Sequence, residues 1–332
     1  MSKDMGQARR RGLLQPGDRV QITDPKGKMH TIILVPGGRF QSARGALNHD
    51  DVLGGPDAQV VTTEEGRTFQ VIRPLLSDYV LSMPRGAAIV YPKDAAQIVQ
   101  MGDIFPGARV LEAGVGSGAL SLSLLQAVGE GGHLLSVEQR PDFAQIAAAN
   151  VDLWFGQRHP AWELQVGDVG EVAGGLEPAS LDRVVLDLLD PWSYLEQVRR
   201  VLRPGGVLIC YVATVTQLSR VADDLRATEA FTEPQSWEST VRPWHVEGLA
   251  VRPEHRMVAH TGFLLTARLL GQDQHVHQLA RRPAKAAVDQ PGKWARVTNW
   301  RLEDLGMRSQ SPKKTRRIQR DLEGRLNQWL GR

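Results

Sequence analysis

A glycine-rich turn between a predicted strand and a predicted helix is the clearest chemical signal in the sequence. Gly114, Gly116 and Gly118 follow the strand segment 109–112, and the helical segment 119–128 begins directly after them. Glycine lets the backbone turn tightly and lets a ligand approach closely. The first N–H groups of a helix have no partner within it and can bind an anion. The pattern therefore predicts a ligand site at the carboxyl end of this strand.

An acidic residue follows the glycine turn at the position where a ribose-binding carboxylate belongs. Glu138 ends the next predicted strand, 133–138, and a carboxylate there can accept hydrogen bonds from both ribose hydroxyls. Two kinds of enzyme share this arrangement, because the segment 114–119 also fits the dinucleotide-binding fingerprint of dehydrogenases. The loop alone leaves that choice open.

Two features further along the chain favour methyl transfer. A third predicted strand ends at Asp168, whose carboxylate could hold an adenine amine, and a fourth ends near Asp187. A helix and a Pro-Gly-Gly turn at 204–206 come next, before a fifth strand. This series resembles class I S-adenosylmethionine methyltransferases. No acid or base that could serve hydride transfer stands out, which disfavours a dehydrogenase.

The elements that must position these residues follow an α/β pattern. From about residue 81 to residue 270, strand-like and helical segments alternate, which is typical of a parallel sheet wrapped by helices. The further segments are strands at 163–166, 183–188 and 207–212, helices at 142–155 and 193–202, and a last, antiparallel strand at 261–269. We therefore expect a Rossmann-like class I methyltransferase domain at 81–270.

The first 80 residues have a different character. Short apolar strands alternate with turn sequences, such as Asp24-Pro25-Lys26-Gly27 between the strands 19–22 and 30–35. This spacing predicts a small antiparallel β barrel or sandwich. The fold class expected for the whole chain is thus α/β, with a small β-rich domain at 1–80 before the methyltransferase domain.

The remaining segment, 271–332, is a basic extension. Residues 281–332 hold 14 Lys and Arg residues against 5 Asp and Glu residues, a net charge of +9, so the first 280 residues carry −6. Such asymmetry favours a segment that meets a polyanion, although charge alone fits a solvated extension without a partner equally well. The stretch 318–330 could form a short helix with Ile318, Leu322, Leu326 and Trp329 on one face.

Composition excludes several other classes of protein. The longest uncharged stretches, 113–129 and 204–219, are short for a membrane span and are interrupted by glycines. Residues 1–11 contain no apolar run, so we expect a cytoplasmic protein without a secretory signal. The one cysteine, Cys210, fits a buried apolar position. We expect no metal site, because His275 and His277 have no Cys or acidic partner at ligand spacing.

A narrower resemblance covers about residues 14–270. Its carriers are Gly38-Arg39-Phe40 to Arg44-Gly45, Asn48-His49-Asp50-Asp51, Arg73-Pro74, Asp78-Tyr79, Met83-Pro84-Arg85, Ile89-Val90-Tyr91-Pro92-Lys93-Asp94, Glu112-Ala113-Gly114 with Gly116-Ser117-Gly118, Asp187-x-x-x-Pro191-Trp192 and His260-Thr261-Gly262-Phe263-Leu264. Together they resemble the tRNA adenine-58 N1-methyltransferase family of bacteria and archaea. Methyltransferases as a class do not share the Tyr-Pro-Lys-Asp box combined with Asp-x-x-x-Pro-Trp.

The resemblance implies a cofactor, a substrate and an assembly. It implies that S-adenosyl-L-methionine methylates adenine N1 at position 58 of tRNA, and that the enzyme is a homotetramer. The residues expected to bind the cofactor are Glu112, Gly114, Gly116, Ser117, Gly118, Ala119, Leu120, Glu138, Arg140, Asp168, Val169 and Asp187. The alternatives left open are another class I methyltransferase, acting on protein or a small molecule, and a non-catalytic tRNA-binding subunit.

Asp187 is the expected catalytic carboxylate. Adenine N1 carries a lone pair and no proton, so its methylation needs no general base, but the ring becomes cationic and a fixed carboxylate would stabilise that charge. The alternative role for Asp187 is to cap the following helix near Ser193. Asp190 is its rival, with Trp192 either stacking on the base or packing under the loop. Tyr91, expected to help position the base, is the second expected catalytic residue.

Basic side chains are expected to contact the tRNA backbone. Pulling a base out of a folded tRNA costs a few kcal/mol, and contacts of Lys and Arg with phosphates would offset that cost. The candidates are Arg39, Arg44, Arg85, Lys93 and the basic extension. The two histidines of the family pattern, His49 and His260, are expected to be structural.

Overall fold

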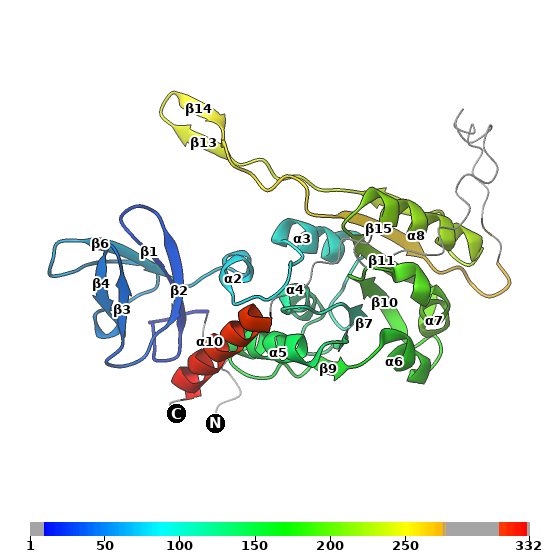
Figure 1. The fold of residues 1–332 in the computed structure, drawn as a ribbon, viewed down its shortest axis with the longest axis horizontal. Coiled ribbons are helices and arrows are strands. Elements are labelled where there is room, and N and C mark those ends of the chain that lie inside the picture. Colours follow the sequence, from blue (N-terminus) through cyan, green and yellow to red (C-terminus); the bar gives the residue numbers. More distant parts are fainter. Residues whose placement is uncertain (1–9, 275, 277–311, 331–332) are drawn as a thin grey trace.

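The structure is a computed structural model of the chain, and it describes residues 10–274, 276 and 312–330. Figure 1 shows a small β domain at one end, a larger sheet wrapped by helices, and a hairpin that projects from the larger domain towards the same end as the small one. Among the described residues, no helix is both long and apolar enough to cross a bilayer. The histidines His275 and His277 lie outside the described residues.

The N-terminal domain consists of two antiparallel sheets around one apolar core. The larger sheet has the order β2-β1-β6-β5, and the smaller is the hairpin β3–β4. Their bounds are β1 Arg19–Thr23, β2 Met29–Ile33, β3 Arg39–Ser42, β4 Gly45–Asn48, β5 Gln59–Thr62 and β6 Thr68–Ile72, with the 3₁₀ turn η1 at His49–Asp51. Val20 and Phe69 of the larger sheet pack with Phe40 and Leu47 of the hairpin. This shared core confirms the predicted small β domain.

A seven-stranded sheet forms the centre of the larger domain. Its order is β12-β15-β11-β10-β7-β8-β9, with β7 to β11 parallel and β15 antiparallel to both of its neighbours. The strands are β7 Arg109–Ala113, β8 His133–Glu138, β9 Trp162–Val166, β10 Leu181–Leu186, β11 Leu202–Val212, β12 Gln235–Trp237 and β15 Phe263–Arg268. The expected Rossmann-like fold is confirmed, and so is the last antiparallel strand.

Helices cover both faces of this sheet. They are α2 Leu76–Ser82, α3 Pro92–Met101, α4 Ala119–Val128, α5 Pro141–Phe155, α6 Val169–Gly175, α7 Leu195–Val201 and α8 Val215–Ala227, with the 3₁₀ turn η2 at Pro191–Tyr194. Successive residues of a strand point to opposite faces. Val185 accordingly packs into one apolar cluster, whereas Val184, Leu186 and the fully buried Cys210 pack into the other. Burial of both faces explains why the central strands are almost continuously apolar.

A two-stranded arm projects from the sheet, and the sequence patterns did not predict it. Its strands are β13 Trp244–Glu247 and β14 Ala250–Pro253, and Figure 1 shows them far from the core. Its strands are only four residues each, which is too short a run for the alternation of Trp244 and Val246 with His245 and Glu247 to identify a strand.

The C-terminal helix α10, Pro312–Leu330, folds back onto the body of the chain. It begins six residues before the predicted helix. Ile318 and Leu322 are buried in a cluster with Ile33 of β2 and Ile146 and Leu153 of α5, and Leu326 packs at its edge. The predicted apolar face is therefore real over these three residues, and it joins the N-terminal domain to the methyltransferase domain. The side chain of Trp329 lies outside the described residues.

This packing predicts that Leu322→Ala loosens α10. Leu322 is 2% exposed, and truncation of such a leucine typically costs about 2–5 kcal/mol. Amide hydrogens of 312–330 should then exchange roughly thirtyfold faster or more, as measured by hydrogen-exchange mass spectrometry. Leu326→Ala, at the edge of the same cluster, should have a smaller effect. Unchanged exchange in the Leu322 variant would show that the helix is not held by this contact.

Candidate active site

The glycine turn brings the ends of β7 and β10 unusually close together. Gly114 has a left-handed backbone (φ 87°), and a Cβ atom at this position would collide with the backbone carbonyl oxygen of Asp187. The amide of Asp187 donates to the carbonyl of Ala113 at 2.9 Å. At Gly116 the place of a Cβ atom is open, with no heavy atom within 4 Å. Gly114 is thus required for backbone packing, whereas Gly116 leaves room above the turn.

Glu138 is tied to the glycine turn through the backbone. Its carboxylate accepts hydrogen bonds from the amides of Gly116, at 2.9 Å, and Arg140, at 3.1 Å. The guanidinium of Arg140 lies over the ring of Phe143, 3.5 Å from its centroid. A carboxylate has about four acceptor positions, so two chain donors leave Glu138 able to accept the hydroxyls of a ribose.

Glu112 is completely buried under the turn. One oxygen of its carboxyl group accepts hydrogen bonds from Ser121, at 2.7 Å, and Ser136, at 2.6 Å. The other oxygen has no partner among the described residues. Burial raises the pKa of Glu112 to about 7, against the effect of the two serine hydroxyls. A side chain held in this way supports the turn from below and fixes where β7 ends.

Asp168 caps helix α6. One of its oxygens accepts hydrogen bonds from the backbone amides of Gly170, at 2.8 Å, and Glu171, at 3.2 Å. The other oxygen accepts hydrogen bonds from the side-chain amide of Gln139, at 3.2 Å, and from the hydroxyl of Tyr194, at 3.1 Å. Burial and the nearby carboxylates raise the pKa of Tyr194 to about 12. The chain therefore fixes the orientation of Asp168 at the end of β9. Its contact with an adenine amine stays a prediction.

Three expected cofactor residues begin helices with their side chains in the core. Ala119 and Leu120 open α4, and Val169 opens α6, all at 5% exposure or less. Their side chains are therefore part of the apolar core, and their contact with the cofactor stays a prediction. Ser117 is equally buried, and Asn150 donates to its carbonyl and to that of Pro84, each at 2.9 Å. These bonds fasten the segment before Tyr91 to the glycine turn.

Asp187 lies at the carboxyl end of β10, next to the glycine turn, and its carboxylate is unpaired. No hydrogen bond or ion pair within the described residues engages it. Burial raises its pKa to about 7, and the charges of Glu112 and Glu138 act in the same direction. The alternative of a helix cap near Ser193 is wrong for Asp187, because the Ser193 hydroxyl bonds Asp190 instead, at 2.9 Å.

The rival pair, Asp190 and Trp192, is engaged elsewhere. The bond to Ser193 ties Asp190 into its own turn. Arg220 of α8 lies 4.3 Å from the centroid of the Trp192 ring, which packs against the apolar cluster beneath. Packing under the loop is thus the role of Trp192 in this structure.

Two tyrosines lie near one another at this edge, and Tyr211 is close enough to Asp187 to feel its charge. Tyr91 precedes α3 and packs at the edge of one apolar cluster. Tyr211 of β11 is nearly buried, and burial together with the charges of Asp94 and Asp187 raises its pKa. The sequence reasoning missed Tyr211, since nothing local to β11 distinguishes it from a core residue. Tyr211 thus lies near both Tyr91 and Asp187, although the three residues come from separate elements.

A buried ion pair fixes the base of the arm beside these tyrosines. Asp94 is fully buried, and Lys93 bonds it at 2.7 Å. Both roots of the arm join this pair, because Ser239 and Thr261 each donate to Asp94, at 2.8 and 2.6 Å, and also lie within hydrogen-bond distance of Lys93. Lys93 is therefore not free to contact a phosphate, and that expectation was wrong.

The family pattern also contains three arginines expected to contact the tRNA, and two histidines. Arg39 is exposed, Arg44 is 3.9 Å from Asp24, and Arg85 is half-buried near the turn. His49 accepts a hydrogen bond from the amide of Val35, and His260 lies 3.0 Å from Glu238. These contacts agree with structural roles for the two histidines.

Comparison with known proteins agrees with this geometry. Residues 12–61 match the TrmI-like N-terminal domain, and residues 69–252, more than half of the chain, match the family of the tRNA methyltransferase complex GCD14 subunit. The tRNA (adenine(58)-N(1))-methyltransferase TrmI of Thermus thermophilus is 37% identical over 249 residues, which cover 74% of this chain and 95% of that protein. The chain belongs to this tRNA methyltransferase family.

Further members of the family and solved structures extend the comparison. The tRNA (adenine(57)-N(1)/adenine(58)-N(1))-methyltransferase TrmI of Methanocaldococcus jannaschii is 28% identical, over 75% of this chain and 94% of its own length. The crystal structure of TrmI from Aquifex aeolicus has a TM-score of 0.68 at 27% identity and covers 79% of this chain and all of that one. A SAM-dependent O-methyltransferase from Thermotoga maritima has a TM-score of 0.73 at 29% identity, covering 79% and 96%.

The charge of the residues present suits S-adenosylmethionine, and the glycine turn is not obstructed at Gly116. The open space over Gly116 provides room, and the carboxylates of Glu138 and Asp187 suit hydroxyl groups and a positive charge. The Glu112 carboxyl group, buried beneath, adds to the negative potential when it is ionised.

The geometry of the turn predicts opposite outcomes for two glycine substitutions. Gly114→Ala should abolish measurable cofactor binding, because the new methyl group collides with rigid backbone at Asp187. In Gly116→Ala the new methyl group contacts no other atom, and the only cost is the strain of a positive φ, about 1 kcal/mol. The affinity for the cofactor should therefore fall roughly fivefold. Isothermal titration calorimetry with S-adenosylmethionine measures both. Equal effects would contradict the close approach of β7 and β10.

Proposed function

We propose that this protein transfers the methyl group of S-adenosyl-L-methionine to N1 of adenine 58 in tRNA. The observation that carries the proposal is the unpaired carboxylate of Asp187 beside the glycine turn, in a chain of the tRNA methyltransferase family. A non-catalytic tRNA-binding subunit would not need Asp187, Glu138 and the open turn together. Because tRNA is the substrate, we also place the enzyme in the cytoplasm.

The chemistry assigned to Asp187 is electrostatic. Bound S-adenosylmethionine supplies an electrophilic methyl group on a positively charged sulfur. Asp187 accepts a hydrogen bond from the exocyclic amine of adenine, which aims N1 at the methyl group. As positive charge moves onto the ring, the fixed carboxylate stabilises it in a site with little water. Tyr91 and Tyr211 form the wall beside the base and restrict its orientation.

The proposal is tested by mapping the product. The protein is incubated with methyl-labelled S-adenosylmethionine and unmodified tRNA, and the labelled nucleoside is identified and located by mass spectrometry. We expect 1-methyladenosine at position 58. Label on a protein or a small molecule in a cell extract, with none on tRNA, would overturn the proposal in favour of another methyltransferase activity.

Two aspartate substitutions separate the catalytic carboxylate from its rival. Asp187→Ala should lower kcat by about two orders of magnitude, in line with removal of one preorganised electrostatic group. Asp190→Ala should lower kcat only a few-fold, because Asp190 is bonded to Ser193. Single-turnover methylation with saturating tRNA measures both. A crippled Asp190 variant beside a nearly active Asp187 variant would reverse the assignment.

The raised pKa of Asp187 predicts how the rate depends on pH. Only the ionised carboxylate stabilises a cation, so kcat/KM for S-adenosylmethionine, which reports groups of the free enzyme, should rise with pH and level off above the pKa of about 7. In Asp187→Asn the remaining activity should lack this rise. Rates measured from about pH 5.5 to pH 8.5 test the assignment. A wild-type profile that is flat across this range would mean that Asp187 is ionised throughout or not involved.

We further propose that the enzyme is a homotetramer held together through the arm. Trp244, Val246 and Val251 share one face of the hairpin and are 56%, 71% and 56% exposed. A two-stranded hairpin is marginal by itself, and apolar side chains exposed together mark an interaction surface. A second copy of the chain that covers this face would bury them.

Substitutions on the two faces of the arm test the assembly. Val246→Glu with Val251→Glu should dissociate the tetramer, because burying two carboxylates in an apolar interface is costly. His245→Gln with Arg252→Gln, the cross-strand pair on the opposite face, should leave the mass unchanged. Light scattering at micromolar concentration reports the mass. A monomeric wild-type protein would refute the proposed assembly.

A further inference from the structure

Helix α10 lies outside the part of the chain that matches the family, which ends at residue 252, so the resemblance assigns it no role. Its apolar face, formed by Ile318, Leu322 and Leu326, packs against β2 and α5. The opposite face of the helix therefore points away from the body. A docked helix presents that face in a fixed orientation, unlike a flexible charged segment.

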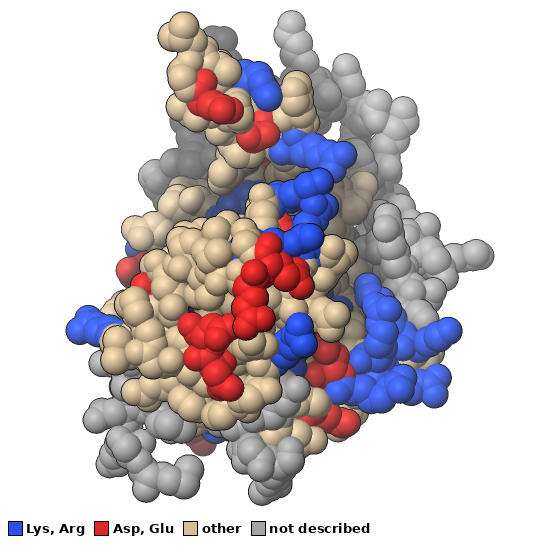
Figure 2. Space-filling model, turned by 90° about the vertical axis from the view of Figure 1, so that its left-hand side faces the viewer, with Lys and Arg blue, Asp and Glu red and all other residues tan. Residues whose placement is uncertain are grey.

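The outward face of α10 is basic. Successive residues are rotated by roughly 100°, which places Lys313, Arg316, Arg317 and Arg320 opposite the apolar face. All four are exposed, and within the described part of the chain no ion pair engages any of them. Figure 2 shows Lys and Arg side chains gathered low on the right-hand flank, where α10, in the foreground of Figure 1, comes to lie. The middle of that view is instead acidic.

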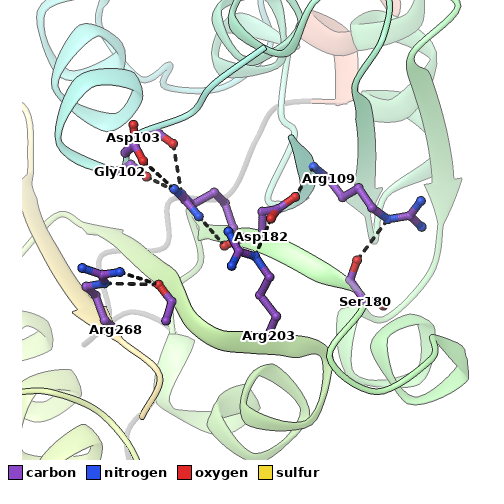
Figure 3. Close-up of polar contacts among 9 residues, drawn as sticks. Gly102, Asp103, Arg109, Ser180, Asp182, Arg203 and Arg268 are labelled. Carbon is purple, nitrogen blue, oxygen red and sulfur yellow. Dashed lines mark hydrogen bonds and ion pairs between the residues drawn. The ribbon is translucent and has the colours of Figure 1, made fainter. Parts of the chain in front are cut away.

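Arginines at the opposite edge of the molecule behave differently. At the amino ends of the parallel strands, Arg183 donates to the carbonyls of Gly102 and Asp103 and pairs with the Asp103 carboxylate at 2.8 Å. Arg203 pairs with Asp182 at 2.5 Å (Figure 3). These guanidinium groups hold strands and loops together, so they have little capacity left for an external anion. The free positive charge of α10 is thus a distinct feature.

The basic turns of α10 lie at the cofactor side of the sheet. Gln319 bonds Gln145 of α5 at 3.3 Å, and Arg325 lies near Tyr79, whose hydroxyl donates to the carbonyl of Asn150. The two helices therefore run in the same direction. Lys313 precedes Gln319 by six residues, or about 9 Å, which brings it level with the start of α5. That start follows Glu138 at the carboxyl edge.

We propose that Lys313, Arg316, Arg317 and Arg320 bind backbone phosphates of the tRNA substrate and hold it against the cofactor edge. This inference rests on the proposed function. A row of basic side chains on one helix face can follow a sugar–phosphate backbone, and contacts of this kind position a nucleic acid without reading its bases. The first 280 residues carry −6, so this face also offsets the repulsion that the rest of the chain exerts on a polyanion.

The test compares three sets of substitutions in the full-length protein. The first removes the charge: Arg316→Gln, Arg317→Gln and Arg320→Gln. The second keeps it: Arg316→Lys, Arg317→Lys and Arg320→Lys. The third removes the same charge at the far edge: Arg199→Gln, Arg203→Gln and Arg226→Gln. Binding of unmodified tRNA is measured by fluorescence anisotropy at several salt concentrations, and hydrogen exchange of 312–330 confirms that α10 stays docked.

The expected result is specific to charge on α10. The first set should weaken tRNA binding roughly tenfold or more at low salt. It should also lower the slope of log K against log salt by about 2 to 3, because each of the three lost phosphate contacts removes about 0.7 to 0.9 of a released counterion. The second and third sets should stay close to the wild type. Equal losses in the first and third sets, or no loss in the first, would overturn the proposal.

Product mapping keeps this test separate from the proposed function. If the inference alone is wrong, the wild type and all three variants still form 1-methyladenosine at position 58, with the same tRNA affinity and salt slope. If the proposed function is wrong, the wild-type protein itself fails to methylate that position. At saturating tRNA the first set should methylate the same adenine at a rate near that of the wild type, since the contacts position the backbone only.

Discussion

Negative charge confined to a small space with little water is the constraint on which the site depends. Glu112, Glu138 and Asp187 meet around one glycine turn, and burial raises the pKa of both Glu112 and Asp187 to about 7. Hydrogen bonds from two serines offset the cost of burying the Glu112 carboxylate, and hydrogen bonds from two backbone amides offset the same cost at Glu138. Asp187 has no such partner. A cation placed beside it would relieve the repulsion, which is why we assign the positively charged sulfur and the methylated base to this position.

The sheet creates this arrangement because its strands are parallel. β7, β8 and β10 are neighbours, so their carboxyl ends deliver Glu112, Glu138 and Asp187 to one edge. The absence of a side chain at Gly114 then lets the chain after β10 close over the turn. On the outside, the ion pair of Lys93 and Asp94 fastens both roots of the arm next to the tyrosines. The position of the arm and the position of the two tyrosines are thus physically connected.

Local patterns predicted the parts of the structure that are defined locally. The strands, the glycine turn and the acids at the strand ends follow from short-range periodicity and turn chemistry, so they could be read from the sequence. The choice of Asp187 over Asp190 came from family resemblance. The structure adds a physical reason, because the Asp190 carboxylate already accepts a hydrogen bond from Ser193. Lys93 was misassigned to a phosphate because its partners Ser239 and Thr261 are 146 and 168 residues away. Tyr211 was missed because nothing local to β11 distinguishes it from a core residue, and the arm because its strands are only four residues long.

The most direct test of the account compares a charged with an uncharged ligand at this site. Calorimetry gives the affinities of S-adenosylmethionine and of its demethylated product, which lacks the positive charge on sulfur, from about pH 5.5 to pH 8.5. If ionised Asp187 faces the sulfur, the preference for S-adenosylmethionine should increase as pH rises through about 7, and Asp187→Asn should remove that increase. A preference that does not change with pH in the wild-type protein would contradict the role assigned to the buried carboxylates.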